Sequence, residues 1–175
     1  MTCKTSIVDC LKNKGIAVKT FSSSVHNGHE HSFGIITNME DHFHSLFEPN
    51  QWWGIDFKRT IGIHSYRIVT CNACNYVRNW TISLSHNNIS YFNVDSHSGL
   101  HPNGTVYQLG KTYNARYLKI SGNAPGCQTS THQTLKNILA FNYAEFFGAI
   151  TPVLSCKRKY QNNKYIIFIT LLIAS

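Results

Sequence analysis

The densest group of potential metal ligands is a set of histidines between residues 26 and 44: His26, His29, His31, His42 and His44. Imidazole is the most common metal ligand in proteins, and the polar sequence around these residues predicts loops in which ligands can converge. Their spacing, however, matches no zinc-finger or metalloprotease motif. We therefore expect surface histidines and no metal site.

A C-x-x-C motif at Cys71 and Cys74 is a second candidate for chemistry. A zinc ribbon needs another such pair and a thioredoxin-like redox site needs a βαβ setting, and the sequence offers neither. We expect two reduced cysteines in a loop. The N-terminal residues also lack the apolar segment of a secretory signal, which predicts a cytoplasmic protein whose six cysteines are mostly reduced.

Two carboxylates, Asp56 and Glu145, lie within apolar segments that we expect to be strands. They could form an acid–base pair, but a buried charge needs compensation, and we favour pairing with a basic group such as Arg116. His64 and Ser65 could complete a catalytic triad with Asp56, yet no nucleophile elbow of the G-x-S-x-G type accompanies them. The sequence also has no phosphate-binding or dinucleotide-binding glycine motif. We therefore expect no catalytic residues, no cofactor and no enzyme.

The positive charge of the chain is concentrated at its two ends. Of the formal net charge of +8, +3 lies in residues 1–19 and +4 in residues 156–175, which leaves +1 for residues 20–155. A nucleic-acid-binding face would need clustered Lys and Arg on the folded domain, so we expect no nucleic-acid partner. The apolar run at residues 165–174 is about half of the ~20 residues that a spanning helix needs, which predicts no stable membrane span.

Alternation of apolar and polar residues is the strongest structural signal. Trp80, Ile82 and Leu84 alternate with Thr81 and Ser83, which predicts a strand whose apolar side chains face the core and whose polar side chains face out. Large aromatic residues elsewhere on the expected strands should also lie in the core: Trp53, Tyr117 and Phe146. Further strands are predicted at residues 15–21, 53–57, 61–70, 89–94, 106–109, 115–120 and 135–147.

Short strands at this spacing, separated by turns, are typical of a β-sandwich or jelly roll. No internal repeat or low-complexity linker divides the chain. We therefore expect one domain at residues 13–150, preceded by an N-terminal extension at residues 1–12 and followed by a basic and apolar tail at residues 151–175.

Several segments resemble, in the same order, the strands of a known domain family. Residues 48–58 (EPNQWWGIDFK) are similar to its "PNQW–IDFK" strand and residues 63–68 (IHSYRI) to the "I–SY–I" strand that follows. The family's opening strand, its "NWVIEGS" and "ARYIRI" strands and its closing "EFFG" resemble residues 13–23, 79–85, 113–120 and 144–148. The chain thus resembles the discoidin-like domains, of the coagulation factor V/VIII C-type and the galactose-binding-like superfamily, and most closely the intracellular BTB-associated type.

This resemblance implies an all-β jelly-roll sandwich of about eight antiparallel strands, with a ligand bound by loops at one end. The sequence departs from the family after residues 79–85, where the usual Asp-Gly is absent and Tyr91 or Phe92 must replace a Trp. Secreted members tie their ends with a disulfide. Cys10 and Cys156 lie near suitable ends, but we expect no bond between them because the thiols should be reduced.

The resemblance further implies a non-catalytic recognition module that binds a carbohydrate or a protein partner. The alternative is a structural or interaction fragment of a larger scaffold family, without a small-molecule ligand. In the expected loops, Tyr76 could supply a stacking face and Arg78 a bidentate donor. The candidate ligand-binding residues are His26, Asn27, His29, His31, Phe47, Asn50, Gln51, Tyr76, Arg78 and Asn79.

Overall fold

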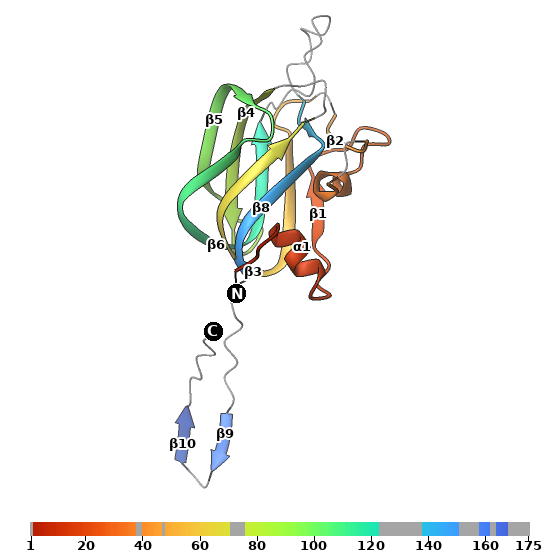
Figure 1. Ribbon diagram of the computed structural model, residues 1–175. Coiled ribbons are helices and arrows are strands. Elements are labelled where there is room, and N and C mark those ends of the chain that lie inside the picture. Colours follow the sequence, from red (N-terminus) through yellow and green to blue (C-terminus); the bar gives the residue numbers. More distant parts are fainter. Residues whose placement is uncertain are drawn as a thin grey trace, which may run out of the picture.

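The computed structural model describes residues 2–37, 40–46, 48–70, 76–122, 138–150, 158–161 and 164–167. Its helical elements are α1 (Ile7–Lys12) and the short 3-10 helix η1 (His31–Ile35). Its strands are β1 (Lys19–Ser22), β2 (Phe43–His44), β3 (Trp52–Val69), β4 (Tyr76–Ser85), β5 (Phe92–Pro102), β6 (Val106–Gly122), β7 (Ala140–Phe141), β8 (Tyr143–Ile150), β9 (Arg158–Gln161) and β10 (Lys164–Ile167). The fold is an antiparallel β-sandwich (Figure 1), which confirms the predicted all-β jelly roll.

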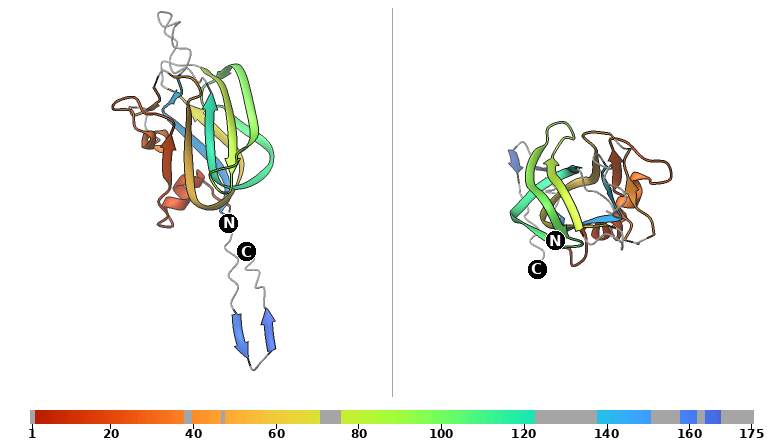
Figure 2. Two further views of the ribbon diagram at one scale, coloured as in Figure 1. Left: turned by 180° about the vertical axis from the view of Figure 1, so that it is seen from behind. Right: turned by 90° about the horizontal axis from the view of Figure 1, so that it is seen from above.

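One strongly curved sheet forms most of the sandwich. Its strand order is β1-β3-β6-β4-β5, and β8 pairs with β3 outside this path. The predicted strands at residues 53–57 and 61–70 are both part of the single strand β3. Likewise, the predicted strands at residues 106–109 and 115–120 are both part of β6. β3 shifts register against β6 between Asp56 and Ile61, and Lys58 in that stretch has a φ of 64°. This irregularity lets the first half of β3 pair with β1 and the second half with β8, so the sheet curves around the core (Figure 2).

The core is filled by the side chains on the inward face of these strands. Trp80, Ile82 and Leu84 are 1%, 0% and 0% exposed, which confirms the predicted inward face of β4. Thr81 on the other face is partly exposed. Ser83 was also expected to face solvent but is buried, because other side chains cover the outer face there; its Oγ donates a hydrogen bond to Asn93 Oδ1 (2.8 Å).

Of the other aromatic residues predicted in the core, Trp53 and Phe146 are completely buried. Tyr117 is not in the core. Leu118 and Ile120 occupy the inward positions of this part of β6, so Tyr117 lies on the outer face, where the Arg116 guanidinium is 5.0 Å from its ring centroid.

Helix α1 lies in the segment that the sequence assigned to an N-terminal extension, yet its apolar side belongs to the core. Ser6 caps the helix by accepting a hydrogen bond from the Asp9 amide (3.3 Å), and Ile7 and Leu11 are 0% exposed. The helix also brings Cys3 and Cys10 to a Cα–Cα distance of 5.9 Å, where they form a disulfide. The expectation of reduced thiols is wrong for this pair, and Cys10 is not available for Cys156.

The two carboxylates within the strands are both paired with arginine. Asp56 accepts hydrogen bonds from Arg116 Nε (2.9 Å) and Nη2 (3.1 Å) and from the Lys58 backbone (2.7 Å) and Nζ (3.0 Å). Glu145 accepts one from Arg67 Nε. The predicted ion pair of Asp56 with Arg116 is therefore confirmed, and each carboxylate is part of a structural ion pair that joins neighbouring strands.

We expect the Asp56 ion pair to make stability depend on acid pH. Burial alone would raise the pKa of Asp56, but the hydrogen bonds from Arg116 and Lys58 outweigh it and lower the pKa from 3.8 to about 2. Because the pKa of Asp56 is lower in the folded than in the unfolded state, the ionised carboxylate stabilises the fold above about pH 4. This stabilisation is lost as the pH falls toward 2. Urea unfolding at pH 7 should show Asp56→Asn to be about 2 kcal/mol less stable than the wild type. The gap should shrink between pH 4 and 2; a gap that is constant with pH would contradict this role.

Candidate ligand-binding site

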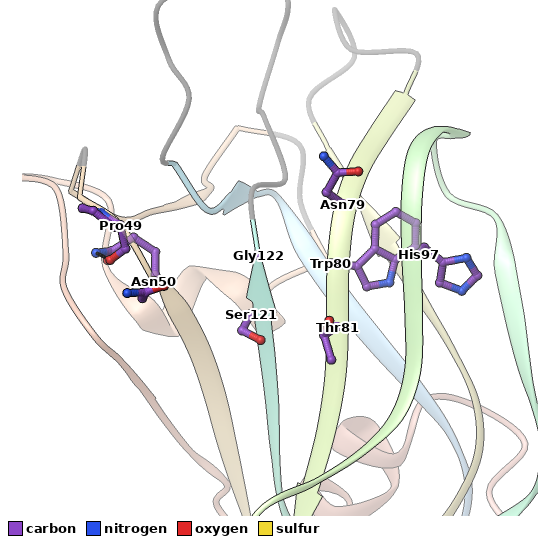
Figure 3. A pocket seen from close by; sticks show the side chains of 9 residues that line it. Pro49, Asn50, Asn79, Trp80, Thr81, His97, Ser121 and Gly122 are labelled. Carbon is purple, nitrogen blue, oxygen red and sulfur yellow. Dashed lines mark hydrogen bonds between the residues drawn. The ribbon is translucent and has the colours of Figure 1, made fainter.

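A cavity of about 560 Å³ lies at one end of the sandwich, where the turn before β3 meets β4, β5 and the end of β6. Most of the side chains around it carry amide or hydroxyl groups (Figure 3). A volume of this size is typical of small-molecule sites. The lining residues are Pro49, Asn50, Gln51, Asn79, Trp80, Thr81, His97, Ser121 and Gly122.

Gln51 holds the turn before β3 against the end of β6. It is buried, and its Oε1 accepts hydrogen bonds from Ser23 Oγ (2.7 Å) and from Ser24 Oγ. Its backbone carbonyl accepts a hydrogen bond from the Gly122 amide (3.3 Å). Asn50 precedes it with a φ of 59°, a left-handed conformation that Asn tolerates well, and its side chain is exposed at the cavity wall. A buried amide with satisfied hydrogen bonds thus fixes this wall in one conformation.

Asn79 forms the wall across from Asn50 (Figure 3). It lies at a β-bulge, where the register of β4 against β5 shifts and its φ is 30°. Its Oδ1 accepts a hydrogen bond from the Gly99 amide on β5 (2.8 Å), so its amide nitrogen is on the side nearer the cavity. Gly122 lies between these walls, and an added Cβ there would overlap the Asn79 carbonyl oxygen. Only glycine lets β6 approach β4 this closely.

A hydrogen-bonded group of aromatic residues supports the cavity wall on β4 and β5. The rings of Trp80 and His97 stack with centroids 4.7 Å apart. Trp80 Nε1 donates to Tyr66 Oη (2.9 Å), and Tyr66 Oη donates to Asp95 Oδ2 (2.7 Å), which is 2.9 Å from His97 Nε2. Burial and Asp95 raise the pKa of Tyr66 far above its usual value, so its hydroxyl stays protonated. The chain of hydrogen bonds orients both rings, which is the preorganisation that a binding wall needs.

The predicted site residues divide into three groups. Asn50, Gln51 and Asn79 line the cavity. His26, Asn27, His29 and His31 do not, although they lie in the predicted loop region. Phe47 and the Cys71–Cys74 motif are outside the described residues, as are the side chains of Tyr76 and Arg78, so their roles stay predictions.

The predicted histidine cluster forms only in part, and none of its members lines the cavity. His26 and His29 come together with His42 and His44, with ring centroids 4.2 to 6.3 Å apart. Burial and the neighbouring imidazoles lower the pKa of His42 and His44, which favours the neutral form of both. Across the described residues, no three His, Cys, Asp or Glu side chains are arranged to hold a metal ion.

His31 lies apart from the other histidines. Its Nδ1 is 2.8 Å from Thr20 Oγ1, and its backbone carbonyl accepts a hydrogen bond from Trp53 Nε1 (2.8 Å). These contacts attach the loop that contains the histidines to the core. The predicted ligand-binding role of this residue therefore has no support from the cavity, whose lining does not include it.

Six cavity residues were not among the candidates from the sequence. Pro49 precedes the candidate Asn50, and the other five lie on strands, whereas the candidates came from expected loops: Trp80, Thr81, His97, Ser121 and Gly122. Proximity in sequence could have found Trp80 and Thr81, which directly follow the candidate Asn79. Nothing in the sequence pointed to His97 on β5. Separately, none of the helices in the described part of the chain is long and apolar enough to cross a membrane.

Comparison with known proteins gives matches among solved structures only. No protein-family model matches the chain, and no curated protein does. One solved match is the CBM32 of AlyQ in complex with 4,5-unsaturated mannuronic acid, with a TM-score of 0.59, 16% identity, and coverage of 75% of this chain and 95% of that one. Another is CpGH89CBM32-5 from Clostridium perfringens in complex with GalNAc-β-1,3-galactose, with a TM-score of 0.59, 12% identity, and coverage of 75% and 95%.

A pectin-binding carbohydrate-binding module matches in the same way, with a TM-score of 0.57, 14% identity, and coverage of 75% of this chain and 88% of that one. Identities this low establish the fold alone. The CBM32 modules have the galactose-binding-like, or discoidin-like, fold. This chain therefore has the jelly-roll β-sandwich fold of these modules.

Proposed function

We propose that this chain is a non-catalytic carbohydrate-binding module and that the saccharide binds in the cavity beside the first half of β4 and the end of β6. The observation that carries this proposal is the lining of the cavity. Amide groups of Asn50 and Asn79 and hydroxyl groups of Thr81 and Ser121 surround a preformed space of about 560 Å³. Such groups both donate and accept hydrogen bonds, as sugar hydroxyls do, and none of the four carries a charge.

Two further observations support a saccharide. The cavity walls are held rigid by Gln51 and by the Tyr66–Asp95–His97 hydrogen bonds, which lowers the ordering cost of binding. In addition, three modules with the same fold bind saccharides: an unsaturated mannuronic acid, a GalNAc-galactose disaccharide and pectin. These ligands differ widely, so the fold leaves the particular sugar open.

A glycan array followed by isothermal titration of the best ligand tests this proposal. We expect the wild type to bind at least one class of saccharide. The variant Ser121→Leu fills the cavity from an outward position on β6 and should weaken binding at least tenfold. Thr112→Leu, at an exposed position elsewhere on β6, makes the same type of change away from the cavity and should bind normally.

Thermal melts of the two variants confirm that both are folded. Binding that survives Ser121→Leu would place the ligand elsewhere. If no saccharide binds, and a pull-down instead recovers a protein through the cavity residues, the protein-binding alternative from the sequence is correct. Cytoplasmic location and kinship with the BTB-associated type remain proposals that rest on the sequence.

A further inference from the structure

The outer face of the sheet holds one lysine between two aromatic rings. Lys119 on β6 has its Nζ 4.1 Å from the ring centroid of Trp52 on β3 and 4.2 Å from that of Tyr91, which precedes β5. Phe21 on β1 packs edge-on against Trp52, with centroids 5.7 Å apart. Gly54, opposite Lys119 in the register, makes room for this arrangement, because an added Cβ would lie 2.7 Å from the Phe21 ring. The ammonium group is thus held in place before any ligand arrives.

Within the described residues, Lys119 has no carboxylate within ion-pair distance. The nearby carboxylate on this face, Asp56, is already bound by Arg116 and Lys58. Lys19 on β1 lies directly opposite Asp56 and is exposed. Partial burial lowers the pKa of Lys119, as expected for a cation that has lost hydration without gaining an acid.

Among the described residues, this face therefore carries four cations (Lys19, Lys58, Arg116 and Lys119) and one carboxylate, Asp56. Two of the cations bind Asp56. Of the other two, Lys119 is the one that aromatic rings hold in place. A preorganised, partly dehydrated ammonium group is suited to one charge-assisted hydrogen bond with an anion.

This ammonium lies next to the candidate cavity. Ser121, the next outward residue of β6 after Lys119, lines the cavity and pairs with Trp52 on one side and Thr81 on the other. Two residues along a strand correspond to about 7 Å. A saccharide seated in the cavity that extends along β6 by this distance reaches the ammonium.

We propose that Lys119, held between Trp52 and Tyr91, binds the carboxylate of an acidic sugar, so that the ligand is a uronic-acid-containing saccharide. This inference rests on the proposed carbohydrate-binding function and adds the ligand class. A nucleic acid is less suited to this face, because its regularly spaced phosphates need several free cations and Asp56 engages two of the four.

The test compares uronate oligosaccharides with the same oligosaccharides after their carboxyl groups have been reduced to alcohols. We expect the wild type to bind the acidic form at least tenfold more tightly at low salt, and the preference to fall as salt is raised. Lys119→Met should remove the preference, and Lys119→Arg should retain part of it. Lys111→Met is the matched control, because Lys111 is also on β6 and also lies over a ring (Tyr113, 4.9 Å), but not beside the cavity.

Each outcome is decisive. If acidic and reduced saccharides bind equally, or if the acidic preference survives Lys119→Met in a folded protein, the inference is wrong and the carbohydrate-binding proposal stands. If no saccharide of either kind binds, the carbohydrate-binding proposal fails as well. Binding of a single-stranded oligonucleotide that is lost in Lys119→Met would assign the face to nucleic acid and overturn the inference.

Discussion

Replacing Trp80 with alanine should lower the free energy of unfolding by about 3–5 kcal/mol. Trp80 is 1% exposed at the centre of β4, and its indole nitrogen donates to Tyr66 Oη (2.9 Å). The change creates a large void and removes a hydrogen bond from a buried hydroxyl, and each effect is destabilising by itself. A loss of this size is a large fraction of the stability of a single domain, so much of the protein should be unfolded at moderate temperature.

Thr81→Ala is the matched control, because Thr81 is the next residue on the same strand but faces outward. Its Oγ1 hydrogen-bonds only with the Ser96 hydroxyl at the exposed surface (2.8 Å). We expect a change within about half a kcal/mol. Thermal melts and urea unfolding of both variants measure the difference. Similar melting temperatures for the two would contradict the assignment of Trp80 to the core.

The second large effect is expected for Gly148→Ala on β8. Gly148 pairs with Ile63 on β3, and an added Cβ would overlap the backbone carbonyl oxygen of Gly62. Since backbone cannot rotate away as a side chain can, β3 and β8 must separate or shift at this point. We expect a loss of about 3 kcal/mol, at the upper end of the range for overpacking. The Cys3 amide, which donates to the Gly148 carbonyl (3.0 Å), would be displaced as well.

Gly62→Ala provides the comparison for Gly148→Ala in the same pair of strands. A Cβ on Gly62 would lie 2.9 Å from the terminal methyl group of Thr112, an exposed side chain that can change rotamer. It should therefore cost at most about 1 kcal/mol. Urea unfolding of the two alanine variants decides the matter. If Gly62→Ala proves as damaging as Gly148→Ala, backbone contact is not what requires glycine at residue 148.

Much of the fold could be predicted because one face of each strand must be buried. The alternation of Trp80, Ile82 and Leu84 with polar residues identified the inward face of β4, and burial confirmed it. The same reasoning placed Asp56 in an apolar strand and required a basic partner, which is Arg116. The sequence order of the strands, together with the family resemblance, indicated the jelly roll.

Some errors came from rules that apply to one strand at a time. Ser83 alternates correctly but is buried, since polar as well as apolar side chains can cover the outer face of a sheet. Tyr117 is large and aromatic but lies outside, because Leu118 and Ile120 hold the inward positions of β6. Size and hydrophobicity predict that a residue is buried only after the register has fixed which face it is on.

The sequence by itself determined the all-β class, the apolar face of β4 and the need of the buried carboxylates for cations. It did not determine every strand: β2, β9 and β10 were not predicted, and β5 spans Phe92–Pro102 where the sequence predicted residues 89–94. Only the tertiary structure decided where the cavity is, because Asn50, Asn79, His97 and Ser121 come from four separate places in the chain. Pairing between distant strands brings them together, and that pairing depends on the bulge at Asn79 and the close approach at Gly122. The position of Lys119 between Trp52 and Tyr91 has the same origin. Local sequence encodes the period of a strand, whereas its register against distant strands is set by the packing of the whole core.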